Sequence, residues 1–167
     1  LWENGRVVEL YFPDWNTPEG NDGAPCKIPS SVQNLTKLTT ISLRHSCLED
    51  LENIGLLMNL ISLKLEGTNI INIPDEIKNL VFLTSLDLSG NSYPSNDFSI
   101  ISNELCGLNN LKYLDLSYNQ IQFLPECIFS NFPNLEHLDF SHNQLSGQIP
   151  AEIGNLTNLE YLNLEYN

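Results

Sequence analysis

The chain has 167 residues, 21 acidic and 7 basic, so its formal net charge at pH 7 is −14. This excess of negative charge disfavours binding to nucleic acid through a basic face and adsorption to an anionic membrane. It favours attraction to cationic partners. No apolar run reaches the length that a membrane-spanning helix needs, so we expect no membrane insertion. The length predicts a single domain over residues 1–167.

A frame of leucines recurs along the chain. A partial first copy holds Val7, Leu10 and Phe12. Six fuller copies follow, and in chain order they read LTKLTTISLRHS, LMNLISLKLEGT, LVFLTSLDLSGN, LNNLKYLDLSYN, FPNLEHLDFSHN and LTNLEYLNLEYN. The second framed leucine stands at positions 38, 60, 83, 111, 135 and 159, which gives separations of 22, 23, 28, 24 and 24 residues. Repeats of this length are typical of solenoids.

The middle of each copy alternates between apolar and other residues, which predicts a short strand with its leucines pointing inward. One strand cannot bury its own leucines, so we expect the copies to stack into one curved, parallel sheet of about seven strands. The last residue of each full copy is polar, and these residues are Ser46, Thr68, Asn91, Asn119, Asn143 and Asn167. We expect this side chain to bind the backbone of its own turn and of the next coil. A hydroxyl does this less completely than an amide, so the N-terminal coils should be less regular.

The segments between the predicted strands carry proline after an apolar residue, at Pro29, Pro74, Pro125 and Pro150. Proline fixes φ and donates no hydrogen bond, which favours bends that lead into short 3-10 or irregular turns. Two longer insertions, residues 13–25 and 91–104, read as surface loops. Such loops are functional in some solenoids and plain connections in others.

Residues 145–167, LSGQIPAEIGNLTNLEYLNLEYN, resemble the plant-type leucine-rich repeat, and similar repeats occur in bacterial surface proteins. The resemblance covers essentially the whole chain and implies an α/β leucine-rich repeat solenoid. Its curved parallel sheet would form the concave face, with short 3-10 or irregular segments on the convex face. The resemblance also implies a binding role, outside the cell or at its surface. Because the chain stops at a framed asparagine, we expect a fragment of a longer repeat protein. Asn34 and Asn155 begin NLT sequons and are candidate glycosylation sites on the convex side.

Four cysteines form two pairs of neighbours: Cys26 and Cys47 hold nearly equivalent places in adjacent coils, and Cys106 and Cys127 lie on the convex side of adjacent coils. Cys26 with Cys47, and Cys106 with Cys127, are candidate disulfides because strands of neighbouring coils lie about 4.8 Å apart and bridged Cα atoms about 5.5 Å apart. The second pair is three residues out of frame. The alternative is four reduced thiols that act as small hydrophobes. No Cys-x-x-Cys pair is present, so we expect no structural zinc, and nothing in the sequence implies a cofactor.

The outward positions of the strands form columns that we predict to bind a partner. Two columns end in aromatic triplets, and the column between them carries three aspartates and ends in Asn163. The predicted binding residues are Tyr113, Tyr118, His137, His142, Tyr161, Tyr166, Asp87, Asp115 and Asp139. Exposed aromatic side chains on a rigid sheet suit protein or peptide recognition, and the aspartates suit a cationic partner.

Other interpretations of this face remain. The aspartates and serines could be plain solubilising residues of a structural spacer, or the tyrosines could stack on sugars. Calcium on Asp87, Asp115 and Asp139 is disfavoured because a flat column supplies few ligands to one ion. Catalysis by Ser141, His142 and Asp139 is disfavoured because an open face offers no pocket and no oxyanion donors. We therefore expect a non-catalytic module.

Overall fold

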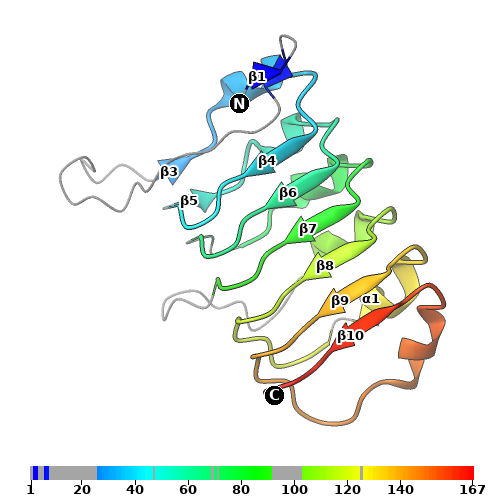
Figure 1. Cartoon of the computed structure of the whole chain (residues 1–167). Helices are drawn as coiled ribbons and strands as arrows, with labels where there is room; N and C mark the ends of the chain where they lie inside the picture. Colours follow the sequence, from blue (N-terminus) through cyan, green and yellow to red (C-terminus); the bar gives the residue numbers. More distant parts are fainter. Residues whose placement is uncertain are drawn as a thin grey trace.

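The computed structural model describes residues 2–3, 6–7, 26–46, 48–68, 70, 72–91, 103–124 and 126–167. Six short strands in this part of the chain form one parallel sheet in the order β10-β9-β8-β7-β6-β4. Figure 1 shows them side by side, rising in sequence from one end of the molecule to the other. Their bounds are Thr40–Ser42 (β4), Ser62–Lys64 (β6), Ser85–Asp87 (β7), Tyr113–Asp115 (β8), His137–Asp139 (β9) and Tyr161–Asn163 (β10).

The pairing register follows the repeat frame. Leu63, Leu86 and Leu114 are partners across three neighbouring strands, and all three are fully buried. Because side chains alternate along a strand, this register puts every framed leucine inside and every intervening residue on the opposite face. We call that opposite face of the sheet the sheet face; it is the face predicted to be concave.

The strand predicted for the partial first copy, at Val7, Leu10 and Phe12, does not join the parallel sheet at Val7. At Val7 the chain belongs to β2 (Arg6–Val7), which pairs antiparallel with β1 (Trp2–Glu3). Leu10 and Phe12 lie outside the described residues. A separate parallel pair joins β3 (Cys26–Lys27) to β5 (Leu48–Asp50).

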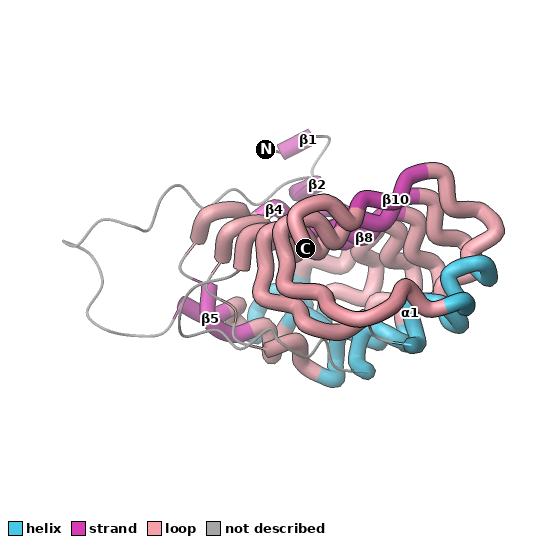
Figure 2. Tube along the Cα trace, turned by 90° about the horizontal axis from the view of Figure 1, so that it is seen from below, coloured by secondary structure: helices cyan, strands magenta, loops and turns pink. Residues whose placement is uncertain are grey.

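Short helical turns cover the side opposite the sheet, as Figure 2 shows. The predicted 3-10 turns are confirmed, and Pro29, Pro74 and Pro150 each stand immediately before one. The segment between β8 and β9 carries a short α-helix instead. The bounds of these elements are Ser30–Asn34 (η1), Ile54–Leu56 (η2), Asp75–Asn79 (η3), Asn103–Gly107 (η4), Glu126–Asn131 (α1) and Ala151–Asn155 (η5). Asn34 and Asn155 are exposed at the ends of η1 and η5, and their glycosylation stays a prediction.

The framed asparagines tie each coil to its neighbour, although to the preceding coil and not to the next. The Asn119 Nδ2 atom donates to the carbonyls of Leu116 and Ser117 in its own turn, at 3.0 and 3.1 Å. It also lies 3.1 Å from the carbonyl of Leu88 in the preceding coil. The Asn119 Oδ1 atom accepts the backbone N–H of Asn91 at 3.1 Å. One buried amide thus satisfies donors and acceptors that a turn would otherwise leave unpaired.

Hydroxyl residues fill this place less completely, as predicted. Thr68 Oγ1 lies 3.0 Å from the Leu65 carbonyl and 2.8 Å from Asn91 Oδ1, and its single proton serves one acceptor at a time. The buried Ser46 Oγ finds no hydrogen-bond partner among the described residues. We call the hydrogen bonds of this framed polar side chain the bracket of its coil. The bracket therefore has fewer hydrogen bonds in the coils of β4 and β6 than in the coils that follow.

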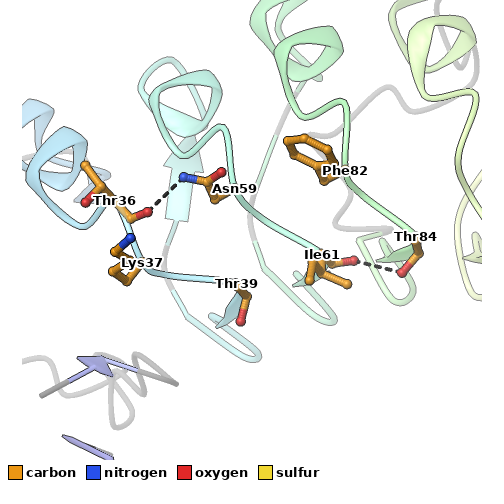
Figure 3. Close-up of a pocket in the computed structure, with 7 residues that line it drawn as sticks. All are labelled: Thr36, Lys37, Thr39, Asn59, Ile61, Phe82 and Thr84. Carbon is orange, nitrogen blue, oxygen red and sulfur yellow. Dashed lines mark hydrogen bonds between the residues drawn. The ribbon is translucent and has the colours of Figure 1, made fainter. Parts of the chain in front are cut away.

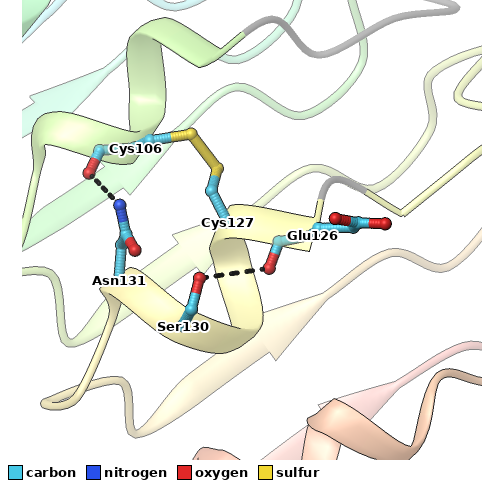
Figure 4. The surroundings of a disulfide bond; sticks show 5 residues. All are labelled: Cys106, Glu126, Cys127, Ser130 and Asn131. Atoms are coloured by element: carbon cyan, nitrogen blue, oxygen red, sulfur yellow. Dashed lines mark hydrogen bonds between the residues drawn. A yellow bond between two sulfur atoms is a disulfide. The ribbon is translucent and has the colours of Figure 1, made fainter.

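A disulfide joins Cys106 of η4 to Cys127 of α1, with a Cα–Cα distance of 5.6 Å (Figure 4). The predicted bridge between these cysteines is therefore present despite their three-residue offset. Asn131 Nδ2 donates to the Cys106 carbonyl at 3.1 Å, which adds a second link between the same two turns. The predicted Cys26–Cys47 bridge involves Cys47, which lies outside the described residues.

Candidate binding face

The six predicted aromatic residues lie together on the C-terminal half of the sheet face, in two stacked rows. The strand row consists of Tyr113, His137 and Tyr161, the first residues of β8, β9 and β10. Its ring centroids are 4.4 and 4.2 Å apart, and the rings are within 15° of parallel. The parallel register places these residues directly opposite one another, and a strand spacing of about 4.8 Å matches the separation of stacked rings.

The turn row consists of Tyr118, His142 and Tyr166, each one residue before a framed asparagine. Its centroids are 4.0 and 4.3 Å apart, with interplanar angles of 11° and 14°. All three residues have positive φ, at 53°, 53° and 56°. This left-handed backbone costs about 1–2 kcal/mol for a residue with a side chain. Stacking returns about 0.5–1.5 kcal/mol per pair, so the two stacked pairs offset only part of the backbone cost of the three residues.

Glycine occupies the turn-row position in two other coils, where the same backbone carries no such cost. Gly67 and Gly90 have φ of 61° and 67°. In the coil of β4 the position is His45, also at positive φ, and its ring lies over Gly67, where an added Cβ would be 2.5 Å from His45 Nδ1. The aromatic triplet is therefore a feature of the C-terminal coils and not a requirement of the turn.

The aspartate column between the rows is partly committed to the fold. In the three Asp-x-Ser stretches, where x is leucine or phenylalanine, one carboxylate oxygen accepts the backbone N–H of the serine two residues later. The distance is 2.9 Å from Ser117 to Asp115 and 2.7 Å from Ser141 to Asp139. A short side chain that bonds the backbone two residues on is a common turn device. The Asp-x-Ser motif thus fixes the backbone where β7, β8 and β9 end.

The second carboxylate oxygen differs from coil to coil. In Asp115 it accepts the Tyr113 hydroxyl at 3.2 Å, and in Asp139 it accepts Asn163 Nδ2 at 3.1 Å. In Asp87 it pairs with Arg44 Nη2 at 3.3 Å, and the Asp87 residue is only 6% exposed. Asp115 and Asp139 are half-buried. Asp87 is thus the least available member of the predicted site.

Burial, followed by the charges of Asp115 and Asp87, raises the pKa of Tyr113 above its ordinary value of 10.0. The phenol therefore stays neutral and donates its proton to Asp115. This donor–acceptor pair is a fixed polar point at the edge of the strand row.

The arrangement of these side chains gives little support to calcium binding or to catalysis by Ser141, His142 and Asp139. The described residues contain no group of three or more His, Cys, Asp or Glu side chains that could hold a metal ion. The His142 ring lies between Tyr118 and Tyr166, and the backbone N–H of the buried Ser141 is bonded to Asp139. These residues support one another's positions on an open face.

Sequence reasoning missed a second asparagine ladder on the lateral side of the solenoid, just before the strands. Its donors reach carbonyls of the preceding coil at 2.7–3.3 Å, and they are Asn59, Asn110, Asn134 and Asn158. In the coil of β7 the ladder position holds the exposed Phe82. The signal was present in the repeats MNL, NNL, PNL and TNL, which VFL interrupts.

Comparisons with known proteins identify the same repeat. The family model described as leucine rich repeat matches residues 109–167. The LRR ectodomain of the plant membrane receptor kinase GASSHO1/SCHENGEN3 from Arabidopsis thaliana, solved with Casparian strip integrity factor 2, superposes with a TM-score of 0.70 and 26% identity. It aligns over 83% of this chain and 17% of that chain. The plant peptide hormone receptor RGFR1, solved with RGF2, gives a TM-score of 0.64 and 31% identity over 82% of this chain and 23% of that chain.

The leucine-rich repeat domain of the type III effector XopL is similar in fold alone, at 22% identity and a TM-score of 0.76, over 98% of this chain and 53% of that chain. The chain thus spans under a quarter of the length of the two receptors. In the part of the chain that the structure describes, no helix is long and apolar enough to cross a membrane. The repeat frame, the parallel sheet and these likenesses together place the chain among the leucine-rich repeat proteins.

Proposed function

We propose that the chain is a non-catalytic recognition module, located outside the cell or at its surface, that binds a protein or peptide. The partner would lie across β8, β9 and β10 on the C-terminal half of the sheet face. The two aromatic rows would contact it, and Asp115 and Asp139 would attract its basic groups.

The observation that carries this proposal is the turn row. Three aromatic side chains stand in left-handed backbone, at a position where Gly67 and Gly90 serve the fold without that cost. Strained backbone at such positions is enriched at binding sites. The stacked rings are also held in place before any partner arrives, and preorganised aromatic side chains lose little entropy on binding.

The stacking favours a protein partner over a carbohydrate. A sugar stacks on a free aromatic face, but each inner face of these rows is already covered by a neighbouring ring at 4.0–4.4 Å. The exposed members of the rows are Tyr118, Tyr161 and Tyr166, which carry phenol hydroxyls. These groups, beside half-buried carboxylates, suit the backbone and the basic side chains of a polypeptide.

The comparisons support the same class of partner. RGFR1 is described as a peptide hormone receptor and was solved with RGF2, and the GASSHO1/SCHENGEN3 ectodomain was solved with Casparian strip integrity factor 2. Both superpose on more than four-fifths of this chain. GASSHO1/SCHENGEN3 is described as a membrane receptor kinase, which also supports a place at the cell surface for the present chain.

The test is affinity capture from the secreted proteins of the source organism, followed by mass spectrometry. Wild-type protein would be compared with a turn-row variant, Tyr118→Asn/His142→Asn/Tyr166→Asn. Asparagine tolerates left-handed backbone better than most residues, so this variant keeps the turns. We expect a protein captured by the wild type to bind the variant about 30-fold or more weakly, as for hot-spot residues.

The matched control is Phe82→Asn, which changes an exposed aromatic residue away from the sheet face. It should capture the same protein as the wild type, and circular dichroism should show all three proteins folded. Equal capture by the turn-row variant would move the site elsewhere. Specific retention on polysaccharide beads, lost in the same variant, would favour the carbohydrate alternative.

A further inference from the structure

A shallow groove runs along the lateral side of the solenoid, across the coils that lead into β4, β6 and β7. Figure 3 shows its lining, in which Phe82 lies beside Asn59 and Ile61. The full lining is Thr36, Lys37, Thr39, Asn59, Ile61, Phe82 and Thr84. The groove lies before the strands, so it is separate from the two aromatic rows.

Large apolar side chains are exposed at and beside this groove. The exposed fractions are 46% for Ile61, 58% for Phe82, 59% for Met58 and 53% for Val81. Single exposed apolar residues are ordinary, but a group of them within two neighbouring coils indicates an interaction surface.

Most of the same positions are polar in the C-terminal coils, so the fold does not require large apolar residues there. Met58 and Val81 correspond to Asn109, Pro133 and Thr157 in the repeat frame, while Ile61 corresponds to Lys112, Glu136 and Glu160. Lys112 and Glu136 pair with each other at 2.6 Å. Apart from Pro133, these lateral positions are thus polar in the coils of β8, β9 and β10, and they are apolar beside β6 and β7.

Phe82 is the sharpest departure, because it stands in the lateral asparagine ladder. Asn59 donates to the Thr36 carbonyl at 2.8 Å, and Asn110 donates to the Val81 carbonyl at 2.7 Å. By the same frame an asparagine at position 82 would donate to the Met58 carbonyl. The chain forgoes this hydrogen bond and exposes an aromatic ring instead, and aromatic residues are typical anchors of protein interfaces.

The charge of the groove is opposite to that of the chain. Lys37 is the one charged residue among its lining residues, and no carboxylate lines it, although the chain carries a net charge of −14. Lys37 makes no ion pair within the described residues. The hydroxyls of Thr36, Thr39 and Thr84 add polar groups beside it.

We propose that this lateral groove is a second binding site, for an acidic peptide segment with one bulky apolar side chain. That side chain packs on Ile61 and Phe82, flanked by Met58 and Val81. A carboxylate of the peptide pairs with Lys37. Charge complementarity selects an acidic segment here, whereas the sheet face selects a basic one, so the two sites discriminate between partners.

The test is selection of random twelve-residue peptides displayed on phage against immobilised wild-type protein, with removal of phage that bind Phe82→Asn. We expect enriched peptides to share an aromatic or branched aliphatic residue near Asp or Glu. As synthetic peptides they should bind Phe82→Asn at least ten-fold more weakly than wild type. Lys37→Gln should weaken them about two- to five-fold, the range for an exposed ion pair, and added salt should reduce that difference.

Two controls separate this site from the sheet face. The selected peptides should bind the turn-row variant as tightly as the wild type, and Phe82→Asn should unfold no more easily than the wild type. No enrichment over a blank surface, enrichment of basic peptides, or equal affinity for Phe82→Asn would overturn the proposal. A concentration-dependent dimer in sedimentation velocity, lost in Phe82→Asn, would also overturn it by assigning the groove to a second copy of the chain.

Discussion

The coils that contain β4, β6 and β7 differ from those of β8, β9 and β10 at the same positions of one repeat frame. At the start of the strand the first group has Thr40, Ser62 and Ser85, where the second has Tyr113, His137 and Tyr161. Before the framed polar residue, the first group has His45, Gly67 and Gly90, where the second has the turn row. On the lateral side Phe82 of the first group stands where Asn59 and the later coils have asparagine.

This contrast separates residues of the fold from residues of recognition. The framed apolar residues are buried in the coils of β6, β7, β8 and β9, so they do not distinguish one half from the other. At the two ends, Leu35 is partly buried and Leu162 is 40% exposed. The two aromatic rows lie on the sheet face of the C-terminal half, whereas Phe82 lies on the lateral side of the other half. The backbone keeps its register throughout. A repeat protein thereby offers an internal comparison: whatever varies at a fixed frame position is free to serve a partner.

The largest expected effect concerns the cross-link of the C-terminal half. The Cys106–Cys127 bridge has a sequence separation of 21, and a loop of that size stabilises by about 3 kcal/mol. The Cys106→Ser/Cys127→Ser variant should lose about this much free energy of unfolding in urea titrations followed by circular dichroism. A loss below about 1 kcal/mol would mean that the brackets and the core hold these coils without the disulfide.

The brackets of the two halves should differ almost as strongly. Asn119→Ala leaves the buried Asn91 N–H without its acceptor, while the Leu88 and Leu116 carbonyls keep Asn91 Nδ2 and Asn143 Nδ2 as donors. The variant should lose about 1–3 kcal/mol of unfolding free energy. Ser46→Ala removes a buried hydroxyl that has no partner among the described residues and should cost nothing measurable. Urea unfolding of both variants checks this, and equal losses would refute the graded bracket.

A change on the lateral side should stabilise the protein. Phe82→Asn removes an exposed ring and can restore the hydrogen bond that Asn59 and Asn110 make in their coils. One such bond contributes about 0.5–1.5 kcal/mol. The melting temperature by differential scanning calorimetry should therefore rise, with Phe82→Ser as the control that cannot reach the carbonyl in the same way. A fall for Phe82→Asn would show that the ring supports the fold.

The smallest effect concerns pH. The pKa of Tyr113 is raised in the folded protein, so its contribution to stability is complete below the unfolded value near 10 and is lost as pH rises above it. Tyr113→Phe should therefore lose less stability than the wild type between about pH 9.5 and 11. The difference in absorbance at 295 nm between the wild type and Tyr113→Phe should show this phenol titrating above its ordinary pKa of 10.0. Titration at the ordinary value would contradict the burial of the phenol beside Asp115.

The repeat frame predicted most of the fold. Periodic leucines determined the strands, their parallel register and the buried core, because a stacked coil has few other ways to hide them. The proline-led 3-10 turns and the weaker brackets at Ser46 and Thr68 were also foreseen. The direction of the bracket was wrong, because one chain read in order does not show whether an amide faces the coil before it or after it.

The candidate site was predicted in part. The columns of Tyr113 and Tyr118 followed from the frame, and the structure brings each column into a stack. The local bonds of Asp115 and Asp139, the burial of Asp87 and the left-handed turn row depend on three-dimensional geometry. Phe82 was missed because the frame directs attention to inward leucines and to the sheet face, although the break in the lateral asparagine ladder is visible in sequence.

Carbene footprinting of the complex with the captured partner tests the central claim most directly, because it reports the exposure of side chains. Labelling of Tyr118, His142 and Tyr166 should fall in the complex, while labelling of Met58 and Phe82 stays as in the free protein. If the two aromatic rows label equally with and without the partner, and protection appears on the convex turns or the lateral groove, the sheet face is not the recognition surface.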